Sequence, residues 1–243
     1  MRLNKYLAQA GIASRRAADR LIAAGEVRVN GLVVTAMGVD VGENDAVDIG
    51  GDPVSAPEAA IVYLLNKPKG VISSASDDKG RRTVVDLIRD RRRLYPVGRL
   101  DRDTTGALLV TNRGELTHKL THPKYGVKRR YIAQVRGQLP REAAGNLKRG
   151  LRLADGMKVR ASIKLLDRRG GMFLYELVLT EGQNREIKRI FKHYKLPLMH
   201  LHRAEFAGLH VDQLAEGKYR RLRPAEVAAL SRLVAGGQRQ HPA

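Results

Sequence analysis

The chain has 243 residues, 43% of them hydrophobic, and its 45 Lys and Arg against 25 Asp and Glu give a net charge of +20. This length and apolar content suffice for one large domain, or for a small and a medium one, with a buried core. Because the sequence contains no cysteine, it excludes disulfides, a thiol nucleophile and cysteine-ligated zinc or iron–sulfur sites.

The basic residues are unevenly distributed along the chain. Residues 1–60 contain 6 Lys and Arg and 8 Asp and Glu, a net charge of −2, so residues 61–243 have a net charge of +22. This excess is typical of proteins that bind a polyanion, nucleic acid first, with an anionic membrane surface as the competing partner. The basic residues are scattered rather than ranged along one amphipathic helix, which favours nucleic acid. No apolar run approaches about 18 residues and the first residues lack the apolar core of a signal peptide, so we expect a cytoplasmic protein.

The N-terminal segment has the pattern of an α-α-β unit. Apolar residues at helical spacing predict a first helix that Gly11 ends, and Ser14 is a favourable N-cap for a second helix to about Ala24. Asn30-Gly31 between two β-branched runs predicts a hairpin. The acidic, glycine-rich residues 40–52 are expected to add closing strands.

Two arginines in the second of these helices occupy positions that are unfavourable for cations. Arg15 and Arg16 occupy its first turn, where the helix dipole disfavours cations by a few tenths of a kcal/mol each. Beside the free amides of a helix start they would form a phosphate clamp, which would explain their position. The alternative, two solvated arginines, stays open on this pattern alone.

The run R-L-N-K-Y-L-A-Q-A-G-I-A-S-R-R-A-A-D-R-L-I-A-A-G-E-V-R-V-N-G resembles the small RNA-binding domain named after small-subunit ribosomal protein four. Members of that family bind structured RNA with the helix pair. The resemblance implies RNA contacts from Asn4, Lys5, Ser14, Arg15 and Arg16.

A second domain is expected after a linker at residues 51–57. Residues 61–65 are predicted to form its first strand, followed by a turn in which Lys67 and Lys69 flank a proline and suggest a contact to the RNA backbone. Residues 73–82 are predicted to be a polar loop, and residues 84–88 a short helix.

The stretch Y-P-V-G-R-L-D-R-D-T-T-G-A-L-L-V-T, residues 95–111, joins a charged turn to an apolar strand. In an extended turn Asp101 and Asp103 share a side, with Arg99 and Arg102 close to both. Neighbouring cations favour the ionised carboxylate, which can act as a nucleophile or a base but is a poor proton donor. A surface turn with local ion pairs is the alternative for such a triplet.

The longer run G-R-L-D-R-D-T-T-G-A-L-L-V-T-N-R-G-E-L resembles the active-site motif of the pseudouridine synthases, in particular the RsuA/RluB type that modifies ribosomal RNA. The catalytic residue of that family follows R-L, which corresponds to Asp101. The resemblance also implies that Arg99 enters the space left by a flipped base. Gly98 and Gly106 would allow close approach of the backbone.

Two further motifs support this resemblance. Residues 128–135 alternate as a strand, and Tyr131 matches the family's strand tyrosine that packs beside the catalytic Asp, although a strand tyrosine is more often a core residue. The run E-G-Q-N-R-E-I-K-R begins a basic amphipathic helix that would otherwise be read as a surface helix. In the family the basic residue at the Lys188 position pairs with the catalytic Asp, so we expect Asp101 and Lys188 within salt-bridge distance.

The remaining segments carry less chemical information. Residues 138–170 are basic, partly helical and partly extended, without a chemical signature, and residues 171–180 read as a central strand. His200 and His202 share one side of a predicted strand, but a metal site would need further ligands, and none is predicted. A helix is expected from Pro224 to about 234.

The sequence therefore predicts an α+β protein, with an RNA-binding domain and linker at 1–58, a largely antiparallel catalytic domain at 59–235 and a disordered tail at 236–243. The expected reaction is uridine isomerisation in ribosomal RNA, more specifically large-subunit RNA or a subunit precursor, by a monomer without cofactor. A non-catalytic ribosome-assembly factor and a metal-dependent nuclease using both aspartates are the alternatives. Catalysis is assigned to Asp101, Tyr131 and Lys188, and RNA binding in this domain to Lys67, Lys69, Arg99, Arg102 and Arg185.

Overall fold

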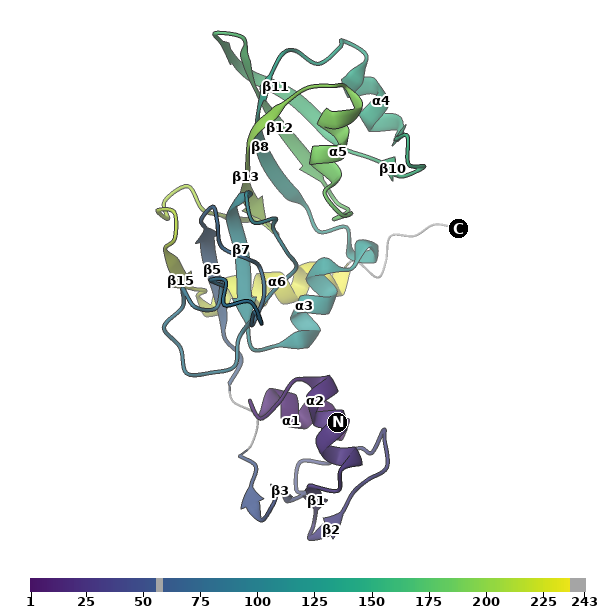
Figure 1. Ribbon diagram of the computed structural model, residues 1–243, viewed down its shortest axis with the longest axis vertical. Coiled ribbons are helices and arrows are strands. Elements are labelled where there is room, and N and C mark those ends of the chain that lie inside the picture. Colours follow the sequence, from purple (N-terminus) through teal and green to yellow (C-terminus); the bar gives the residue numbers. More distant parts are fainter. Residues whose placement is uncertain (56–58, 237–243) are drawn as a thin grey trace. The chain divides into compact units, whose positions relative to one another are not determined.

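The computed structural model describes residues 1–55 and 59–236 (Figure 1). The chain divides into two compact units: an N-terminal unit of Met1–Ala60 with Arg91–Arg93, and a larger unit formed by Ile61–Asp90 and the residues from Leu94 onward. The linker end predicted at residue 58 lies outside the described residues, as does the predicted tail apart from Gly236, the last residue of a helix.

The N-terminal unit packs two helices on a small antiparallel sheet. Helix α1 (Leu3–Gln9) and helix α2 (Arg15–Ala23) contribute buried apolar residues to one core with the strands. The sheet has the order β2-β1-β3-β4, formed by β1 (Val27–Val29), β2 (Leu32–Val33), β3 (Val47–Ile49) and β4 (Asp52–Pro53).

Local signals explain this unit. The Ser14 side chain accepts a hydrogen bond from the Ala17 amide at 3.1 Å, which caps α2. Asn30 and Gly31 both have positive φ, 52° and 79°, as the tight turn of a hairpin requires. The linker predicted at residues 51–57 begins too early, because Asp52 and Pro53 pair with β3 and Val54 is buried in the core.

Within the described residues, the larger unit contains a nine-stranded sheet whose main path is β11-β12-β8-β13-β7-β5-β15. All its strand pairs are antiparallel except β13 with β7, which confirms a largely antiparallel α+β fold. The strands are β5 (Val62–Lys67), β6 (Tyr95–Pro96), β7 (Thr105–Thr111), β8 (Arg129–Arg136), β11 (Ser162–Arg169), β12 (Met172–Leu179), β13 (Leu198–Phe206), β14 (Leu209–His210) and β15 (Tyr219–Arg221).

Helices cover the sheet in two places. Helices α3 (Gly114–Thr121) and α6 (Pro224–Gly236) bury Leu120 and Leu230 against β5 and β7, and a 3-10 turn (Pro123–Tyr125) follows α3. Helix α5 (Glu186–His193) packs against β8 and β12 in a separate cluster. Helix α4 (Ala143–Arg149) and a two-stranded hairpin, β9 (Leu151–Arg152) with β10 (Lys158–Val159), lie next to α5 (Figure 1).

The prediction of a helix at residues 84–88 is wrong. This segment forms bends and a turn, and it buries Val84 and Ile88 against Leu65 and Leu108 of the sheet. The apolar spacing therefore reports contacts to the core rather than a helical period.

The parallel pairing of β7 and β13 depends on Gly106. Its φ is 108°, and a Cβ atom built there would lie 2.2 Å from the Arg203 carbonyl oxygen. Only glycine combines this backbone angle with such a close approach. The strand that follows Asp101 is thereby placed against the centre of β13.

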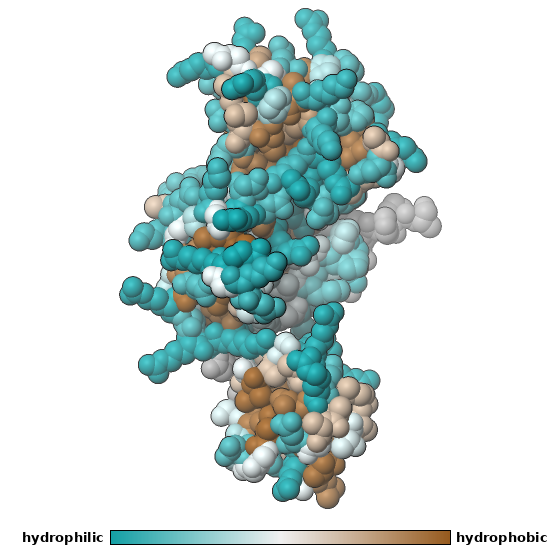
Figure 2. Space-filling model, in the orientation of Figure 1, coloured by the Kyte–Doolittle hydropathy of each residue, from teal (hydrophilic) through white to brown (hydrophobic). Residues whose placement is uncertain are grey.

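The surface is predominantly hydrophilic over the visible face (Figure 2). None of the helices in residues 1–55 and 59–236 is long and apolar enough to cross a membrane.

Candidate active site

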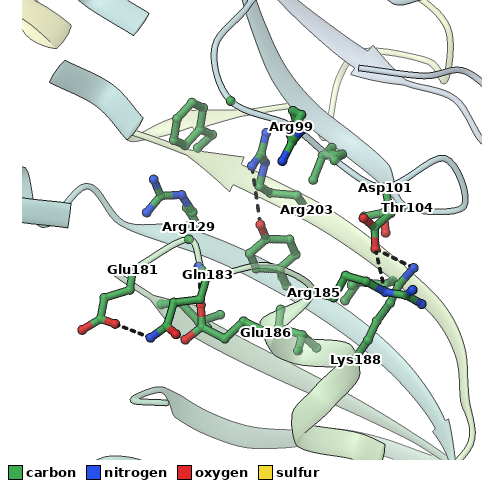
Figure 3. A pocket seen from close by; sticks show the side chains of 18 of the residues that line it. Arg99, Asp101, Thr104, Arg129, Glu181, Gln183, Arg185, Glu186, Lys188 and Arg203 are labelled. Carbon is green, nitrogen blue, oxygen red and sulfur yellow. Dashed lines mark hydrogen bonds and ion pairs between the residues drawn. The ribbon is translucent and has the colours of Figure 1, made fainter. Parts of the chain in front are cut away.

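A cleft in the larger unit collects side chains from distant parts of the chain. It is lined by the turn before β7, by β8 and β13, and by the segment that leads from β12 into α5 (Figure 3). Strands β12, β8, β13 and β7 are neighbours in the sheet. Their order brings together the charged turn before β7, the tyrosine of β8 and the basic helix that follows β12.

Asp101 forms the expected ion pair at one end of this cleft. Its Oδ2 atom lies 2.7 Å from Lys188 Nζ and 3.8 Å from Arg185 Nε (Figure 3). The turn is closed by a hydrogen bond from the Thr104 amide to the Asp101 carbonyl at 3.1 Å. The Lys188 side chain is 16% exposed and that of Asp101 38%, so the pair is partly screened from solvent but reachable from the cleft.

The same ammonium group contacts a second carboxylate. Lys188 Nζ donates to Asp103 Oδ1 at 2.5 Å, and this hydrogen bond holds the pKa of Asp103 below its usual range. Lys188 thus occupies the position between the two carboxylates that a bridging divalent cation would need. Among the residues that the structure describes, no three His, Asp or Glu side chains gather at a possible metal site.

Helix α5 fixes the position of Lys188. Ile187, Ile190 and Phe191 are buried, and they orient the helix so that Lys188 faces the Asp101 turn. Arg185 precedes the helix with a positive φ of 51°. Burial of the apolar face predicted from sequence therefore directs the Lys188 ammonium group toward Asp101.

Lys67 does not lie on an RNA-binding surface. It is fully buried at the end of β5, and its ammonium group donates to the carbonyls of Pro68 and Thr104, both at 2.9 Å. Burial lowers the pKa of Lys67 to about 8. The expected RNA contact of Lys67 is corrected: this lysine supports the Asp101 turn from inside the protein.

Tyr131 and Arg203 form the middle of the cleft. Tyr131, on β8, is half-buried, and its hydroxyl accepts a hydrogen bond from Arg203 Nη1 at 3.4 Å. Arg203, on β13, is 3% exposed, donates from Nε to the Ala107 carbonyl at 2.6 Å and packs over the Phe206 ring. Sequence reasoning missed Arg203; an arginine within an otherwise apolar strand is the signal that could have found it.

The far end of the cleft contains Arg129, Gln183 and Glu186 (Figure 3). Arg129 is buried and donates to the carbonyls of Val127 and Thr180 at 3.0 and 2.9 Å. Glu186 is 5% exposed, accepts a hydrogen bond from the Gln183 amide at 3.1 Å, and has its pKa raised to about 7 by burial. These three residues were not predicted individually, although Gln183 and Glu186 lie within the motif that begins helix α5.

The other predicted RNA-binding residues of the larger unit are at the surface. Arg99, Arg102 and Arg185 are exposed around the Asp101 turn, and Lys69 is exposed beyond the end of β5. Arg102 Nε donates to the Gly70 carbonyl at 3.2 Å, which joins this turn to the one after β5.

In the N-terminal unit, the predicted residues gather around the start of α2. Asn4 donates to Asp19 at 2.7 Å, and Arg15 Nη2 approaches the Asn4 side-chain oxygen at 3.5 Å. Arg15 and Arg16 are exposed, Lys5 is half-buried on α1, and Ser14 is used as the helix cap.

Comparisons with known proteins assign each of the two units to a family. The RNA pseudouridylate synthase family model matches residues 61–193, and the S4 domain model matches residues 1–47. Ribosomal large subunit pseudouridine synthase B of Bacillus subtilis is 44% identical, with 98% of each chain covered. The protein of the same name from Pseudomonas aeruginosa is 36% identical, over 95% of this chain and 61% of its own length. A crystal structure of a pseudouridylate synthase has a TM-score of 0.68 and 27% identity, covering 95% of this chain and 99% of its own.

An S4 domain followed by a synthase domain with a carboxylate in its cleft defines an RNA-modifying isomerase. The chain belongs to the RNA pseudouridine synthase family, whose reaction converts uridine to pseudouridine.

Proposed function

We propose that this enzyme isomerises a specific uridine of large-subunit ribosomal RNA, with Asp101 as the catalytic carboxylate. The observation that carries the residue assignment is the ion pair between Asp101 and Lys188 within the cleft. The substrate is inferred from the names of the Bacillus and Pseudomonas relatives. The enzyme is expected to act in the cytoplasm as a monomer.

The reaction breaks the bond between uracil N1 and ribose C1′, turns the base and joins C5 to C1′, with loss of the C5 proton. Asp101 either attacks the ribose or abstracts a ribose proton, and both routes need the ionised carboxylate. Lys188 and Arg185 place positive charge beside this carboxylate. No group leaves the RNA other than that proton, so the chemistry needs no nucleotide or redox partner.

The target base must leave its stack before it reaches Asp101, at a cost of about a few kcal/mol. Tyr131, which lines the cleft, is expected to pack against the uracil, and the exposed Arg99 to enter the space that the base leaves. Arg102, Arg185 and Lys69 are expected to contact RNA around the cleft. Asn4, Lys5, Ser14, Arg15 and Arg16 of the S4 domain would add affinity rather than chemistry.

Tritium release from C5-labelled uridine tests this function. Unmodified large-subunit RNA, small-subunit RNA and precursors of both subunits are incubated with the enzyme, and the modified position is then mapped. We expect release from a large-subunit substrate at a single site. Release only from small-subunit RNA would contradict the substrate assignment, and RNA binding without release from any substrate would favour a ribosome-assembly factor.

A further inference from the structure

The hairpin β9–β10 carries basic side chains on its outer face. Arg152 and Lys158 lie directly opposite each other in the antiparallel register, and Arg160 follows on the same side two residues later. All three are exposed, whereas the alternate residues Leu153 and Val159 are buried against α4 and α5. The hairpin therefore has one face packed on the core and one exposed, basic face.

The outer face concentrates positive charge without compensation. Like charges directly opposite each other on two strands are destabilising. The nearby Asp155 forms an ion pair with Arg189 instead, with 2.6 Å between Arg189 Nη1 and Asp155 Oδ2. Within the described part of the chain, Arg152, Lys158 and Arg160 form no ion pair. An external anion would relieve the repulsion among them.

Gly150 keeps two of these cations close together. A Cβ atom built on Gly150 would lie 2.6 Å from Lys158 Cε and 3.2 Å from Arg160 Nε. Both side chains therefore cross the glycine backbone, and a larger residue would push them apart.

The hairpin is joined directly to the wall of the cleft. Gln183, which lines the cleft, donates from Nε2 to the Lys158 carbonyl at 2.9 Å. Arg189, the neighbour of Lys188 on α5, holds the hairpin turn through Asp155. A polyanion that enters the cleft could therefore continue from Gln183 onto the strand that carries Lys158.

We propose that Arg152, Lys158 and Arg160 bind the phosphate backbone of the RNA that flanks the target nucleotide. The identity of the polyanion rests on the proposed function. An RNA strand presents phosphates at regular spacing, so it can neutralise several cations of one face and release the counterions bound to it.

The test replaces Arg152, Lys158 and Arg160 together with Gln and measures RNA binding by fluorescence anisotropy between 50 and 200 mM salt. The matched control replaces Lys218, Arg221 and Arg232 with Gln, which removes the same number of exposed lysines and arginines elsewhere on the larger unit. We expect Kd for a large-subunit RNA fragment to rise about tenfold or more in the hairpin variant only. Its plot of log affinity against log salt should become shallower by about two, while turnover at saturating RNA is retained. Equal weakening in both variants, or none in the hairpin variant, would overturn the proposal.

The single variant Arg152→Gln separates binding from folding. It removes one of two opposed cations, so its Tm should be unchanged or higher while its affinity for RNA falls several-fold. A lower Tm with unchanged affinity would assign Arg152 a structural role instead. Binding is measured with non-substrate RNA as well. If wild-type enzyme modified no ribosomal RNA, the proposed function would fail, while a selective loss of RNA affinity would still support this surface.

Discussion

A single ammonium group, Lys188 Nζ, lies 2.7 Å from Asp101 Oδ2 and 2.5 Å from Asp103 Oδ1. One cation therefore balances two carboxylates that sit two residues apart on one turn. Without it, the two carboxylates would repel each other and one would take up a proton more readily.

Replacing Lys188 with Met should lower kcat by about tenfold to a hundredfold, which corresponds to roughly 1.4–2.7 kcal/mol of activation free energy. The acidic limb of the pH–rate profile should move to higher pH, because the hydrogen bond that lowers the pKa of Asp103 is lost and the two carboxylates no longer share a cation. Lys192→Met, an exposed residue of the same helix, is the control and should leave the profile unchanged. A Lys188 variant with the wild-type profile would exclude this role.

Lys67→Met should weaken the support of the Asp101 turn. The substitution leaves the buried carbonyls of Pro68 and Thr104 without a donor, at about 1–3 kcal/mol for each group. We expect a lower Tm and a lower kcat with little change in KM for RNA. If Lys67 contacted RNA instead, KM would rise and Tm would not fall.

The same variant should change the pH dependence of stability. The pKa of Lys67 is lowered from 10.5 to about 8, so the unfolded state binds more protons between these values and wild-type stability rises with pH there. Lys67→Met should lack this rise. Denaturant unfolding of both proteins between about pH 7.5 and 10.5, a range that covers both pKa values of Lys67, measures this difference in stability.

Glu186→Gln should alter stability in the opposite pH direction. The pKa of this carboxyl is raised from 4.5 to about 7, so the folded state holds its proton where the unfolded state has lost it. The contribution of Glu186 to the free energy of unfolding is therefore fully present below pH 4.5 and is lost as the pH rises through about 7. The total loss is on the order of 3 kcal/mol. The stability of the wild type relative to Glu186→Gln should fall over this window. A constant difference would show that folding does not raise the pKa of Glu186.

Gly106→Ala should unfold the larger unit or destabilise it by more than about 3 kcal/mol, because a methyl group would collide with the backbone of Arg203. Gly208 is the matched control, since its φ is also positive, +80°, but no atom lies within 4 Å of an added Cβ. Its alanine variant should cost only about 1 kcal/mol. Chemical denaturation compares the two, and equal losses would mean that backbone angle rather than the contact with β13 requires glycine.

Local patterns predicted much of the fold. The Ser14 cap and the Asn30-Gly31 turn depend on contacts within a few residues, and the apolar face of α5 follows from the helical spacing of its residues; the structure confirms each. The helix prediction for residues 84–88 failed because the apolar residues of this segment serve tertiary contacts with β5 and β7. A short periodic pattern does not distinguish a helix from a loop that buries side chains four residues apart.

The site was predictable only where a motif named it. The pairing of Asp101 with Lys188 followed from resemblance, and composition alone would not have joined residues so distant in sequence. Lys67 was misassigned because a lysine beside a proline turn reads as exposed, while its burial depends on where β5 ends in the sheet. Arg203 and Arg129 were missed because their partners are backbone carbonyls elsewhere in the fold, of Ala107 in β7 and of Thr180 just after β12.

The most direct test of the catalytic assignment compares Asp101→Asn with Asp103→Asn in the tritium-release assay. Both variants remove one negative charge from the same turn, and RNA affinity is measured for each so that binding and chemistry are separated. The account predicts that Asp101→Asn binds RNA but releases no tritium, whereas Asp103→Asn, whose side chain is 60% exposed, still does so. Release by Asp101→Asn at the wild-type rate would contradict the assignment of the catalytic carboxylate.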